Sequence, residues 1–320
     1  MALYLVTGGA GFIGSHIVHA LLARGDRVRV LDDLSGGRMH NLEGREVGQA
    51  GSGAPVEFLQ GSVDDAEAAR NACEGVQGVF HHAALVSVPR SVEDPGLSFR
   101  INVQGTFELL RAAAAGGAER FVLASSSAIY GEDETVPKVE SMAPDPVSPY
   151  AGDKLTGETM LQVWGRSFGL GTVALRYFNV YGPRQADDSP YSGVIALFAR
   201  AALEGRQVKI FGDGLQTRDF VFVEDVVQAN LLAMDARDLA PGARFNVGTG
   251  EAVTIRDLYD EIADIAGSGV EPLHEEGRKG DVRHSRADIT AIHSSLGFTP
   301  RVARREGLER TVRWYGERGG

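Results

Sequence analysis

The sequence has almost no cysteine and no apolar run long enough to cross a bilayer. Cys73 is the one cysteine among 320 residues, which excludes an internal disulfide and a cysteine-based metal cluster. The thiol suits a reducing compartment and is expected to pack as a small apolar residue. No signal-peptide pattern precedes the first apolar strand. We therefore predict a cytoplasmic protein that does not insert into a membrane.

Positive charge is also scarce. Lys and Arg number 32 against 43 Asp and Glu, which gives a formal net charge of -11, and no basic tract interrupts this acidic balance. Such a chain has little attraction for nucleic acid or for an anionic membrane surface, so neither is expected as a partner. A phosphorylated ligand would need local arginines. The 8 histidines are scattered along the chain, and no metal site is predicted.

Residues 3–15 (LYLVTGGAGFIGS) join a short apolar run to a glycine-rich turn and to the start of a helix. Gly8, Gly11 and Gly14 have the spacing G-x-x-G-x-x-G, and the apolar residues that follow recur at helical period. Glycines permit a tight turn and a close approach of main-chain N–H groups to a pyrophosphate, which a helix N-terminus favours. A flexible turn is the alternative interpretation of this pattern.

A second apolar strand, residues 27–31, favours the first interpretation because it ends in Asp32 and Asp33. An acid at such a strand end, about 20 residues beyond the glycines, binds the ribose diol of a dinucleotide. The same carboxylate repels a 2′-phosphate. The two stretches together predict an NAD site rather than an NADP site.

Strands and helices alternate through the first half of the chain, which is typical of a parallel sheet with helices on both faces. We expect an α/β fold, with a Rossmann-type doubly wound parallel sheet and a smaller C-terminal substrate-binding α/β domain. The predicted domains are residues 1–180, with the NAD site and the catalytic helix, and residues 181–320, from which some strands and helices return to the first. Strands are expected at residues 56–59, 78–82, 120–125 and 172–180, a helix at 95–115 and a loop at 35–55.

Hydroxyl side chains gather where the expected strand 120–125 ends. Ser125, Ser126 and Ser127 lie there, and open α/β sheets bind ligands at the carboxyl ends of their strands. Further on, Tyr150 and Lys154 are four residues apart, so on a helix they share one face. A phenol with a pKa near ~10 is a poor base at neutral pH unless a cation favours its phenolate. Lys154 and a positively charged nicotinamide would supply that charge, and a solvated helix face is the alternative.

Seven motifs cover nearly the whole chain. They are residues 7–14 (TGGAGFIG), 83–84 (AA), 102–106 (NVQGT), 125–131 (SSSAIYG), 150–154 (YAGDK), 175–183 (LRYFNVYGP) and 217–220 (TRDF). Together they resemble the extended short-chain dehydrogenase/reductase family, and within it the nucleotide-sugar 4-epimerases. The resemblance implies bound NAD, a UDP-sugar substrate and inversion of its C4 through a 4-keto intermediate. A non-catalytic dinucleotide-binding scaffold would tolerate loss of Tyr150 or Lys154, and this chain keeps both.

The resemblance also implies roles for residues at matching positions. Tyr150 would remove the 4-hydroxyl proton, Ser126 would bridge that hydroxyl, and Lys154 would hold the NAD ribose and lower the phenol pKa. The implied cofactor contacts are Gly8, Gly11, Phe12, Ile13, Asp32, Asp33, Leu34, Ser35, Ser62, Val63, Ala83, Ala84, Leu85, Asn102, Ser125, Tyr150, Lys154, Tyr177 and Val180. The implied substrate contacts are Ser87, Ser126, Asn179 at the diphosphate, Val194, Lys209, Ile210 and Phe211 at the uracil, Arg218 and Arg278 as phosphate clamps, Asp281 and Ser285.

Departures from the family pattern narrow the expected substrate. Ser127 and Ala128 stand where 4,6-dehydratase relatives carry an acidic pair, which argues against dehydration, and Ser62 replaces an aspartate usual near the adenine. Ser285 replaces a bulky tyrosine of strictly hexose-specific epimerases and would leave room for a 2-acetamido group. UDP-N-acetylhexosamines and UDP-hexoses are the expected substrates. A UDP-glucuronate 4-epimerase, with Arg90 or Arg184 binding the carboxylate, and a nucleotide-sugar dehydratase or reductase remain alternatives.

The resemblance finally implies a homodimer. Relatives commonly pair through the helix that holds Asn102 and the helix that holds Tyr150 and Lys154, in a symmetric four-helix contact. The apolar residues on the second helix would line that contact or belong to the core. They are Leu155, Met160, Leu161 and Trp164.

Overall fold

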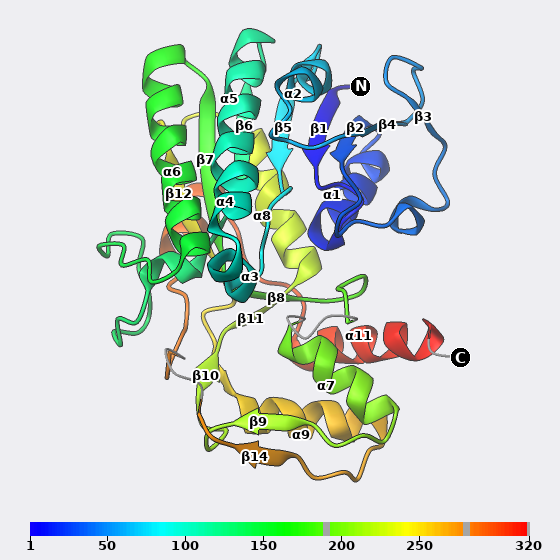
Figure 1. Cartoon of the computed structure of the whole chain (residues 1–320), viewed down its shortest axis with the longest axis vertical. Helices are drawn as coiled ribbons and strands as arrows, with labels where there is room; N and C mark the ends of the chain where they lie inside the picture. Colours follow the sequence, from blue (N-terminus) through cyan, green and yellow to red (C-terminus); the bar gives the residue numbers. More distant parts are fainter. Residues whose placement is uncertain (188–192, 278–281, 319–320) are drawn as a thin grey trace. The chain divides into compact units, whose positions relative to one another are not determined.

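The computed structural model describes residues 1–187, 193–277 and 282–318 (Figure 1). The chain forms two compact units that interleave along the sequence. The first comprises Met1–Ile129, Pro146–Arg176 and Val227–Phe245. The second comprises Tyr130–Asp145, Tyr177–Val226 and Asn246–Gly320. Most of the expected NAD site therefore lies in the first unit, and most of the expected substrate site in the second.

An eight-stranded sheet with the order β12-β7-β6-β5-β1-β2-β4-β3 organises the first unit. The pairs β6–β5, β5–β1, β1–β2, β2–β4 and β4–β3 are parallel. Strand order reverses between β1 and β5, which is where doubly wound sheets bind ligands at the carboxyl ends of their strands. The predicted fold class is confirmed. The strands are β1 Leu3–Thr7, β2 Arg27–Asp32, β3 Val47–Gln49, β4 Val56–Gln60, β5 Gly78–His81, β6 Arg120–Ser126, β7 Gly171–Tyr177 and β12 Ala243–Val247.

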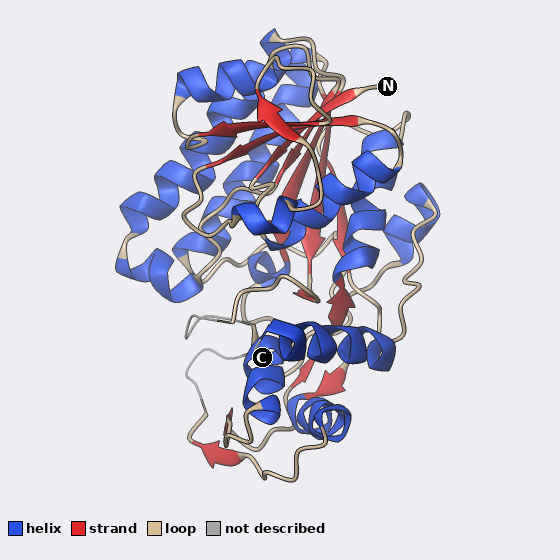
Figure 2. Cartoon of the chain, turned by 90° about the vertical axis from the view of Figure 1, so that its right-hand side faces the viewer, coloured by secondary structure: helices blue, strands red, loops and turns tan. Residues whose placement is uncertain are grey.

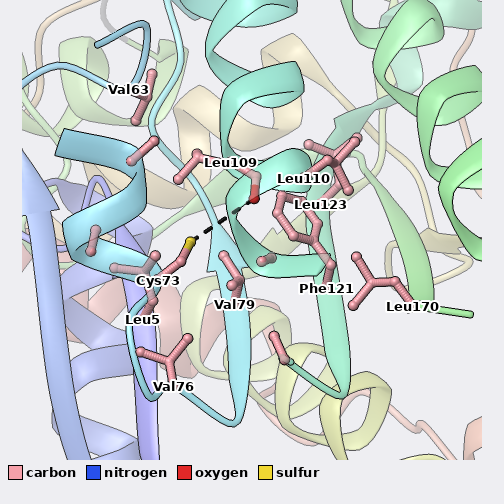
Figure 3. Close-up of a cluster of buried hydrophobic side chains, with 14 of the residues drawn as sticks. Leu5, Val63, Cys73, Val76, Val79, Leu109, Leu110, Phe121, Leu123 and Leu170 are labelled. Atoms are coloured by element: carbon pink, nitrogen blue, oxygen red, sulfur yellow. Dashed lines mark hydrogen bonds between the residues drawn. The ribbon is translucent and has the colours of Figure 1, made fainter. Parts of the chain in front are cut away.

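Helices cover both faces of this sheet, and Figure 2 shows its strands fanning out between them. One face is covered by three helices that pack as neighbours: α2 (Ala66–Cys73), α5 (Gly105–Ala115) and α6 (Pro149–Phe168). The core beneath them includes Leu5, Val79 and Phe121 from successive strands, all fully buried (Figure 3). Cys73 packs in the same cluster as expected, and burial raises the pKa of its thiol to about 12. Each buried Leu or Phe stabilises the fold by about 1.5–3 kcal/mol.

The other face carries α1 (Phe12–Ala23) and the part of α8 (Val223–Asp235) that belongs to the first unit. Ile17, Val18 and Leu21 recur at helical spacing along α1 and are fully buried. Just after α1, Arg24 donates two hydrogen bonds to the carboxylate of Asp235 at the end of α8, at 2.8 and 3.1 Å. The apolar spacing seen in the sequence thus places α1 against the sheet, directly after the glycine turn.

Three expectations about local structure need correction. Residues 95–115 form α4 (Pro95–Phe99), a π-helical turn (η2, Arg100–Gln104) and α5, rather than one regular helix. Residues 35–55 include β3 and a short 3-10 helix (η1, Met39–Leu42), because Val47–Gln49 pairs with β4 and completes the sheet edge. The expected strand 172–180 breaks at Phe178, whose N–H donates to the carbonyl of Val247. All three depend on contacts distant in sequence.

The second unit is built from small sheets and three longer helices, α7 (Val194–Leu203), α9 (Ile255–Ala266) and α11 (Arg304–Arg318). In α9, residues at helical spacing are buried, and the ring of Tyr259 packs edge-on against Phe198 of α7 at 5.3 Å. Thr254 caps α9, and Gly267 ends it with a positive φ, as helix signals predict. The sheets pair β8 (Asn179–Tyr181) with β11 (Phe220–Phe222), β9 (Lys209–Phe211) with β14 (Leu273–Glu275), and β10 (Thr217–Arg218) with β13 (Val253–Thr254).

None of the helices in the described parts of the chain combines the length and the apolar character that a membrane crossing requires.

Candidate active site

The glycine turn between β1 and α1 leaves no room for side chains. The N–H of Gly11 donates to the carbonyl of Gly8 at 3.0 Å, which closes the turn. Gly8 has a φ of +66°, and a Cβ there would lie 2.8 Å from the backbone N of Ala83, just beyond the end of β5. A Cβ on Gly14 would collide with the carbonyl of Gly8. Gly11 caps α1 without a side chain, so the first N–H groups of the helix remain available to an anion.

Asp32 lies at the end of β2 with its carboxylate buried beside this turn. Its two oxygens accept from the backbone N–H groups of Ala10 and Leu34, each at 2.9 Å. Burial raises its pKa, although the two N–H donors act in the opposite direction. Asp33, by contrast, is exposed and accepts from the N–H and hydroxyl of Ser35. Of the two predicted acids, Asp32 is the one aimed at the turn, with lone pairs left for hydroxyl donors such as a ribose diol.

Ser62 and Val63, which the resemblance assigns to the cofactor near its adenine, follow the end of β4. The hydroxyl of Ser62 donates to the carboxylate of Asp64, which sequence reasoning did not single out. Val63 is buried, and Gly105 on α5 has no side chain where a Cβ would meet the Val63 side chain. The aspartate expected by family analogy at position 62 is therefore replaced by a serine held by a nearby acid.

Asn102, in the π-helical turn, holds the chain that follows β5. Its Oδ1 accepts from the N–H of Leu85 at 2.9 Å, and its Nδ2 donates to the carbonyl of Leu85 at 3.2 Å. One amide thus satisfies both backbone groups of a residue in the Ala83–Leu85 stretch that the sequence assigns to the cofactor. The geometry favours backbone anchoring for Asn102, and a direct contact with the cofactor stays a prediction.

A directional hydrogen-bond chain runs from β1 to Asn102 through the buried His81. The hydroxyl of Thr7 accepts from the N–H groups of His82 and Ala83 at 3.2 Å, so its own proton goes to Nδ1 of His81 at 2.8 Å. The hydroxyl of Thr106 donates to the carbonyl of Asn102 at 2.6 Å, so it accepts from Nε2 of His81 at 2.9 Å. Every member has one role, which fixes His81 as the neutral Nε2–H tautomer.

This chain and the burial around it predict acid sensitivity. Burial, together with the charge of Lys154, lowers the pKa of His81 well below its usual value and that of His82 to about 3. The unfolded chain takes up both protons as the pH falls through about 6.5, and the folded chain does not. Above that pH neither state takes up these protons, so the protein keeps its full free energy of unfolding. Below it, stability should fall by up to ~1.4 kcal/mol per pH unit for each histidine.

Denaturant titrations between about pH 6.5 and pH 5 check this expectation at one saturating NAD concentration, because bound NAD also stabilises the fold. His82→Asn removes one of the two protons taken up on unfolding, so its stability should fall less steeply with pH than that of the wild type. His274→Gln, at an exposed position of β14, is the control and should keep the wild-type slope. Equal slopes in all three proteins would contradict the assignment.

Tyr150 and Lys154 lie on the first turns of α6, which Ser148 caps by accepting from the N–H of Ala151. The N–H of Tyr150 donates to the hydroxyl of Ser91 at 3.2 Å. The Nζ of Lys154 donates to the carbonyl of Ala124 on β6 at 2.8 Å and lies 5.8 Å from the centre of the Tyr150 ring. Ser126 is two residues beyond Ala124, and its side chain acts to lower the pKa of the Tyr150 phenol. The three predicted catalytic residues thus meet at the carboxyl end of β6.

The pKa values of this group depart from free side chains in the directions that burial dictates. Burial raises the pKa of the Tyr150 phenol, against the lowering effect of its hydrogen bond to Ser126. Burial lowers the pKa of Lys154 to about 8, against the raising effect of the Asp153 carboxylate. The largest influence on the phenol is thus opposite to the lowering expected from the sequence. Phenolate formation needs the positive charge of an oxidised nicotinamide in addition to these side chains.

A buried ion pair, missed by sequence reasoning, lies under this group. Arg176 on β7 is fully buried and donates to both carboxylate oxygens of Glu158 on α6, from Nε at 2.9 Å and from Nη2 at 2.7 Å. The hydroxyl of Ser125 donates to the same carboxylate at 2.6 Å. Glu158 follows Lys154 by one helical turn, so its place on the same face was the available signal. The pair ties α6 to the strand end that carries Ser126.

In the second unit, Asp219 organises the predicted diphosphate residues. Its buried carboxylate accepts from the N–H groups of Thr249, Gly250 and Ala287 at 2.8–3.1 Å and from the Thr249 hydroxyl at 2.7 Å. Its carbonyl accepts from the amide Nδ2 of Asn179 at 3.0 Å. Arg218, the next residue back along the chain, is half-buried, and its Nη1 donates to the carbonyl of Thr217. Asn179 on β8 and Arg218 on β10 therefore belong to two different small sheets, and both lie beside the same buried acid.

The other predicted substrate residues of this unit are spread over three places. Lys209, Ile210 and Phe211 form β9, and Lys209 pairs with Glu275 at 2.7 Å. Ser285 is half-buried, with its N–H donating to the carbonyl of Thr217 at 3.1 Å, and Val194 begins α7. Tyr177 and Val180 also belong to this unit. Arg278 and Asp281 lie outside the described residues. Ser87 belongs to the first unit, where it caps the short helix α3 (Val88–Glu93).

Across the described ranges, no three His, Cys, Asp or Glu side chains gather as they would around a metal ion. The features of the first unit instead define an α/β nucleotide-binding protein. A glycine turn and a buried acid face the switch point of a doubly wound sheet, with a Tyr–Lys helix at the next strand end.

Comparison with known proteins names the family. The profile described as "NAD dependent epimerase/dehydratase family" matches residues 4–248. A UDP-glucose 4-epimerase from Mycolicibacterium smegmatis is 42% identical over 97% of both chains. The structure of a Thermotoga maritima UDP-glucose 4-epimerase with UDP-glucose is 40% identical, with a TM-score of 0.92 and coverage of 99% of this chain and 100% of that one. The protein belongs to the NAD-dependent epimerase/dehydratase family, which confirms the resemblance seen in the sequence.

A second solved relative carries an N-acetylated sugar. It is a UDP-N-acetylglucosamine 4-epimerase from Methanobrevibacter ruminantium in complex with UDP-N-acetylmuramic acid, 37% identical, with a TM-score of 0.92 and coverage of 99% of both chains. Membership in an NAD-dependent family confirms the predicted cofactor. The residues present fit it: a Cβ would fill the space at Gly8 and Gly14, and Asp32 keeps acceptor capacity for a ribose diol.

Proposed function

We propose that the protein is an NAD-dependent UDP-sugar 4-epimerase that inverts C4 through a 4-keto intermediate. The observation that carries the proposal is the meeting of Tyr150, Ser126 and Lys154 at the carboxyl end of β6, two strands from the glycine turn in the sheet order. The comparisons support it, because three relatives that match over nearly the whole chain at 37–42% identity are named as UDP-sugar 4-epimerases.

The chain's own groups would move a proton. The phenolate of Tyr150 takes the proton of the sugar's 4-hydroxyl, directly or through the hydroxyl of Ser126, and gives it back after inversion. Lys154 contributes its ammonium charge, which favours the phenolate, and donors for the hydroxyls of a nicotinamide ribose. What NAD supplies, when bound, is a reversible acceptor for the hydride of C4. The same tyrosine serves both directions for the proton. Because C4 would also regain its hydride on the opposite face, no net consumption of cofactor is expected.

The second unit would hold the nucleotide while the sugar turns. Arg218 and Arg278 would bind the phosphates as charged donors, and Asn179 would add an amide contact at the diphosphate. Lys209, Ile210 and Phe211 on β9 would border the uracil. A substrate fixed by its UDP group leaves the 4-keto sugar free to present its other face. Inversion thus requires a site that holds the UDP group in place while the sugar rotates.

The expected substrates are UDP-GlcNAc with UDP-GalNAc, and UDP-glucose with UDP-galactose. Incubation of the purified protein with UDP-GlcNAc, UDP-glucose and UDP-glucuronate, followed by separation of the C4 epimers, tests the proposal. Interconversion of either of the first two supports it, and interconversion of UDP-glucuronate alone moves the assignment to the uronate alternative. Turnover-dependent consumption of NAD(P)H or loss of water from the sugar would replace it by the reductase or dehydratase alternative.

Ser285→Tyr should discriminate between the two preferred substrate classes. A bulky phenol at this position would fill the space proposed for a 2-acetamido group. We expect kcat/KM for UDP-GlcNAc to fall by at least ~10-fold more than kcat/KM for UDP-glucose, about the effect of excluding a small group from a pocket. Equal effects on the two substrates would mean that Ser285 does not border the sugar. Ser295→Tyr, at an exposed position of the helix Thr290–Leu296, is the control for a surface tyrosine.

A homodimer and a cytoplasmic location are also part of this proposal. On α5 and α6, the rings of Phe107, Trp164 and Phe168 form a row with centroid separations of 5.6 and 5.5 Å. Phe107 and Phe168 are 40% and 62% exposed, so apolar surface remains for a second copy to cover. Leu161 on α6 is core, whereas Trp164 is only half-buried. Sedimentation of the purified protein would report the dimer directly.

A further inference from the structure

A second buried carboxylate lies on the catalytic helix, at a position to which neither the proposed mechanism nor the family motif gives a role. Asp153 immediately precedes Lys154 and is 9% exposed. Its Oδ2 accepts from the hydroxyl of Ser98 at 2.5 Å and lies 3.4 Å from Nδ2 of Asn102. Ser98 lies in the last turn of α4 and Asn102 lies in the π-helical turn, so this side chain joins α6 to the segment that precedes α5.

These neutral donors do not balance the charge. A buried carboxylate persists only where charge or strong hydrogen bonds compensate its loss of water. Lys154, itself 6% exposed, is the neighbouring cation, and its Nζ is committed to the carbonyl of Ala124. Among the described residues, Asp153 forms no ion pair with Lys154, so its charge acts on the ammonium through the protein interior, in the direction that favours the charged lysine.

Asn102 connects the same carboxylate to Leu85, in the stretch that the sequence assigns to the cofactor. Its Nδ2 is shared among the carbonyl of Leu85, the hydroxyl of Ser98 and Asp153, while its Oδ1 accepts from the N–H of Leu85. An acceptor at position 153 thus helps to orient the amide that holds Leu85. Loss of that acceptor would loosen α6 and the stretch after β5 together.

We propose that Asp153 is a positioning residue for the epimerase reaction, which holds Lys154 as an ammonium ion beside Tyr150 and locks α6 onto Ser98 and Asn102. The inference rests on the proposed roles of Tyr150 and Lys154. It adds a counter-charge whose effect on the reaction depends on pH, whereas a purely structural residue would act equally at every pH.

The groups around Lys154 leave Asp153 as its charged partner in the described structure. His81 and His82 on β5 are held neutral, in part by the Lys154 charge itself. Hydroxyl and amide groups make up most of the other neighbours and carry no charge: Ser125 and Ser126 on β6, Ser91 on α3, Ser98 on α4, Asn102 in η2 and Thr106 on α5. Burial favours the neutral form of Tyr150 until an oxidised nicotinamide lies beside it. Glu158, one turn further along α6, is paired with Arg176. Consistent with this, the Asp153 carboxylate raises the pKa of Lys154 against the lowering effect of burial.

The pH profile of kcat tests the proposal in the NAD-loaded enzyme. The acid limb would report formation of the Tyr150 phenolate and the alkaline limb loss of the Lys154 proton, as apparent values of the coupled pair. Asp153→Asn keeps the size of the side chain and an oxygen that can accept from Ser98, but removes the negative charge. Both limbs should then move to lower pH, the alkaline one by about one unit, so that kcat above that limb falls by about 10-fold relative to the wild type.

Three further variants make the outcome decisive. Ser98→Ala keeps the charge and removes one hydrogen bond, so the height of the profile should fall while both limbs stay in place. Asp153→Ser should reproduce the shift if Asp153→Asn does not fold. Asp260→Asn, on the exposed face of α9, should leave the profile unchanged.

The outcomes separate this inference from the proposed function. Limbs that stay in place in a folded Asp153→Asn or Asp153→Ser enzyme would overturn the role of Asp153, whatever the height of the profile. Retained turnover in Tyr150→Phe would instead overturn the proposed site on which the role depends. A shift of both limbs, with Tyr150→Phe inactive, supports both.

Discussion

Tyr150→Phe is expected to lower kcat for C4 epimerisation by ~10²- to 10⁴-fold, the usual contribution of a positioned general base. The substitution removes only the phenol oxygen, and it leaves the ring, whose centre lies 5.8 Å from Nζ of Lys154. Steady-state formation of the C4 epimer measures the loss. Calorimetric titration with UDP measures binding, which should stay within a few-fold of wild type because UDP would bind to residues of the second unit.

Tyr259→Phe is the matched control for this prediction. The hydroxyl of Tyr259 donates to the carbonyl of Val270 in the second unit, so its loss should lower stability by about 1 kcal/mol without changing kcat. A kcat of Tyr150→Phe within a few-fold of wild type would remove Tyr150 as the base. A large loss in both variants would point to disturbed folding rather than to lost chemistry.

Glu158→Gln should lower the free energy of unfolding by about 3–5 kcal/mol, because it leaves the guanidinium of Arg176 buried without its carboxylate partner. Arg176 is fully buried and makes bonds of 2.7 and 2.9 Å to Glu158, so water cannot replace the lost charge. Urea denaturation followed by far-UV circular dichroism, at constant NAD, measures the change. The loss of Ser125 positioning should also lower kcat, because Ser126 is the next residue on β6.

A surface pair on α11 provides the control. Arg305 and Glu309 form an ion pair of 3.3 Å in which the two side chains are 55% and 46% exposed. Glu309→Gln should change stability by less than about 1 kcal/mol, because solvent screens the charges of an exposed pair. If Glu158→Gln and Glu309→Gln had similar effects, the pair at Arg176 would not contribute what its burial indicates.

How much of the site could be predicted depends on the distance along the chain between its parts. The glycine turn could be predicted because Gly8, Gly11 and Gly14 lie within seven consecutive residues and their spacing alone restricts the backbone. The pairing of Tyr150 with Lys154 could be predicted because a four-residue separation places two side chains on one helix face in any fold. The choice between Asp32 and Asp33 could not, since it depends on which carboxylate meets the N–H of Ala10.

The supporting residues were missed for the same reason. Asp153 and Glu158 are ordinary acids on a helix until Ser98, 55 residues away, and Arg176, 18 residues away, are placed against them. In the sequence, His81 is only one of two adjacent histidines at the end of an expected strand. Its tautomer follows only once Thr7 and Thr106 lie on either side of the ring. The π-helical turn at Arg100–Gln104 likewise has no signal in the apolar spacing of residues 95–115.

The sequence alone determined the fold class, the family and the NAD cofactor, because glycine spacing, strand–helix alternation and helix periodicity are constraints that act over a few residues. Only the tertiary structure decided which charges are buried together: Asp153 with Lys154, Glu158 with Arg176, and His81 between two threonines. Burial removes water from groups that are distant in sequence, and the resulting shifts in their pKa values and stability do not exist until those groups meet.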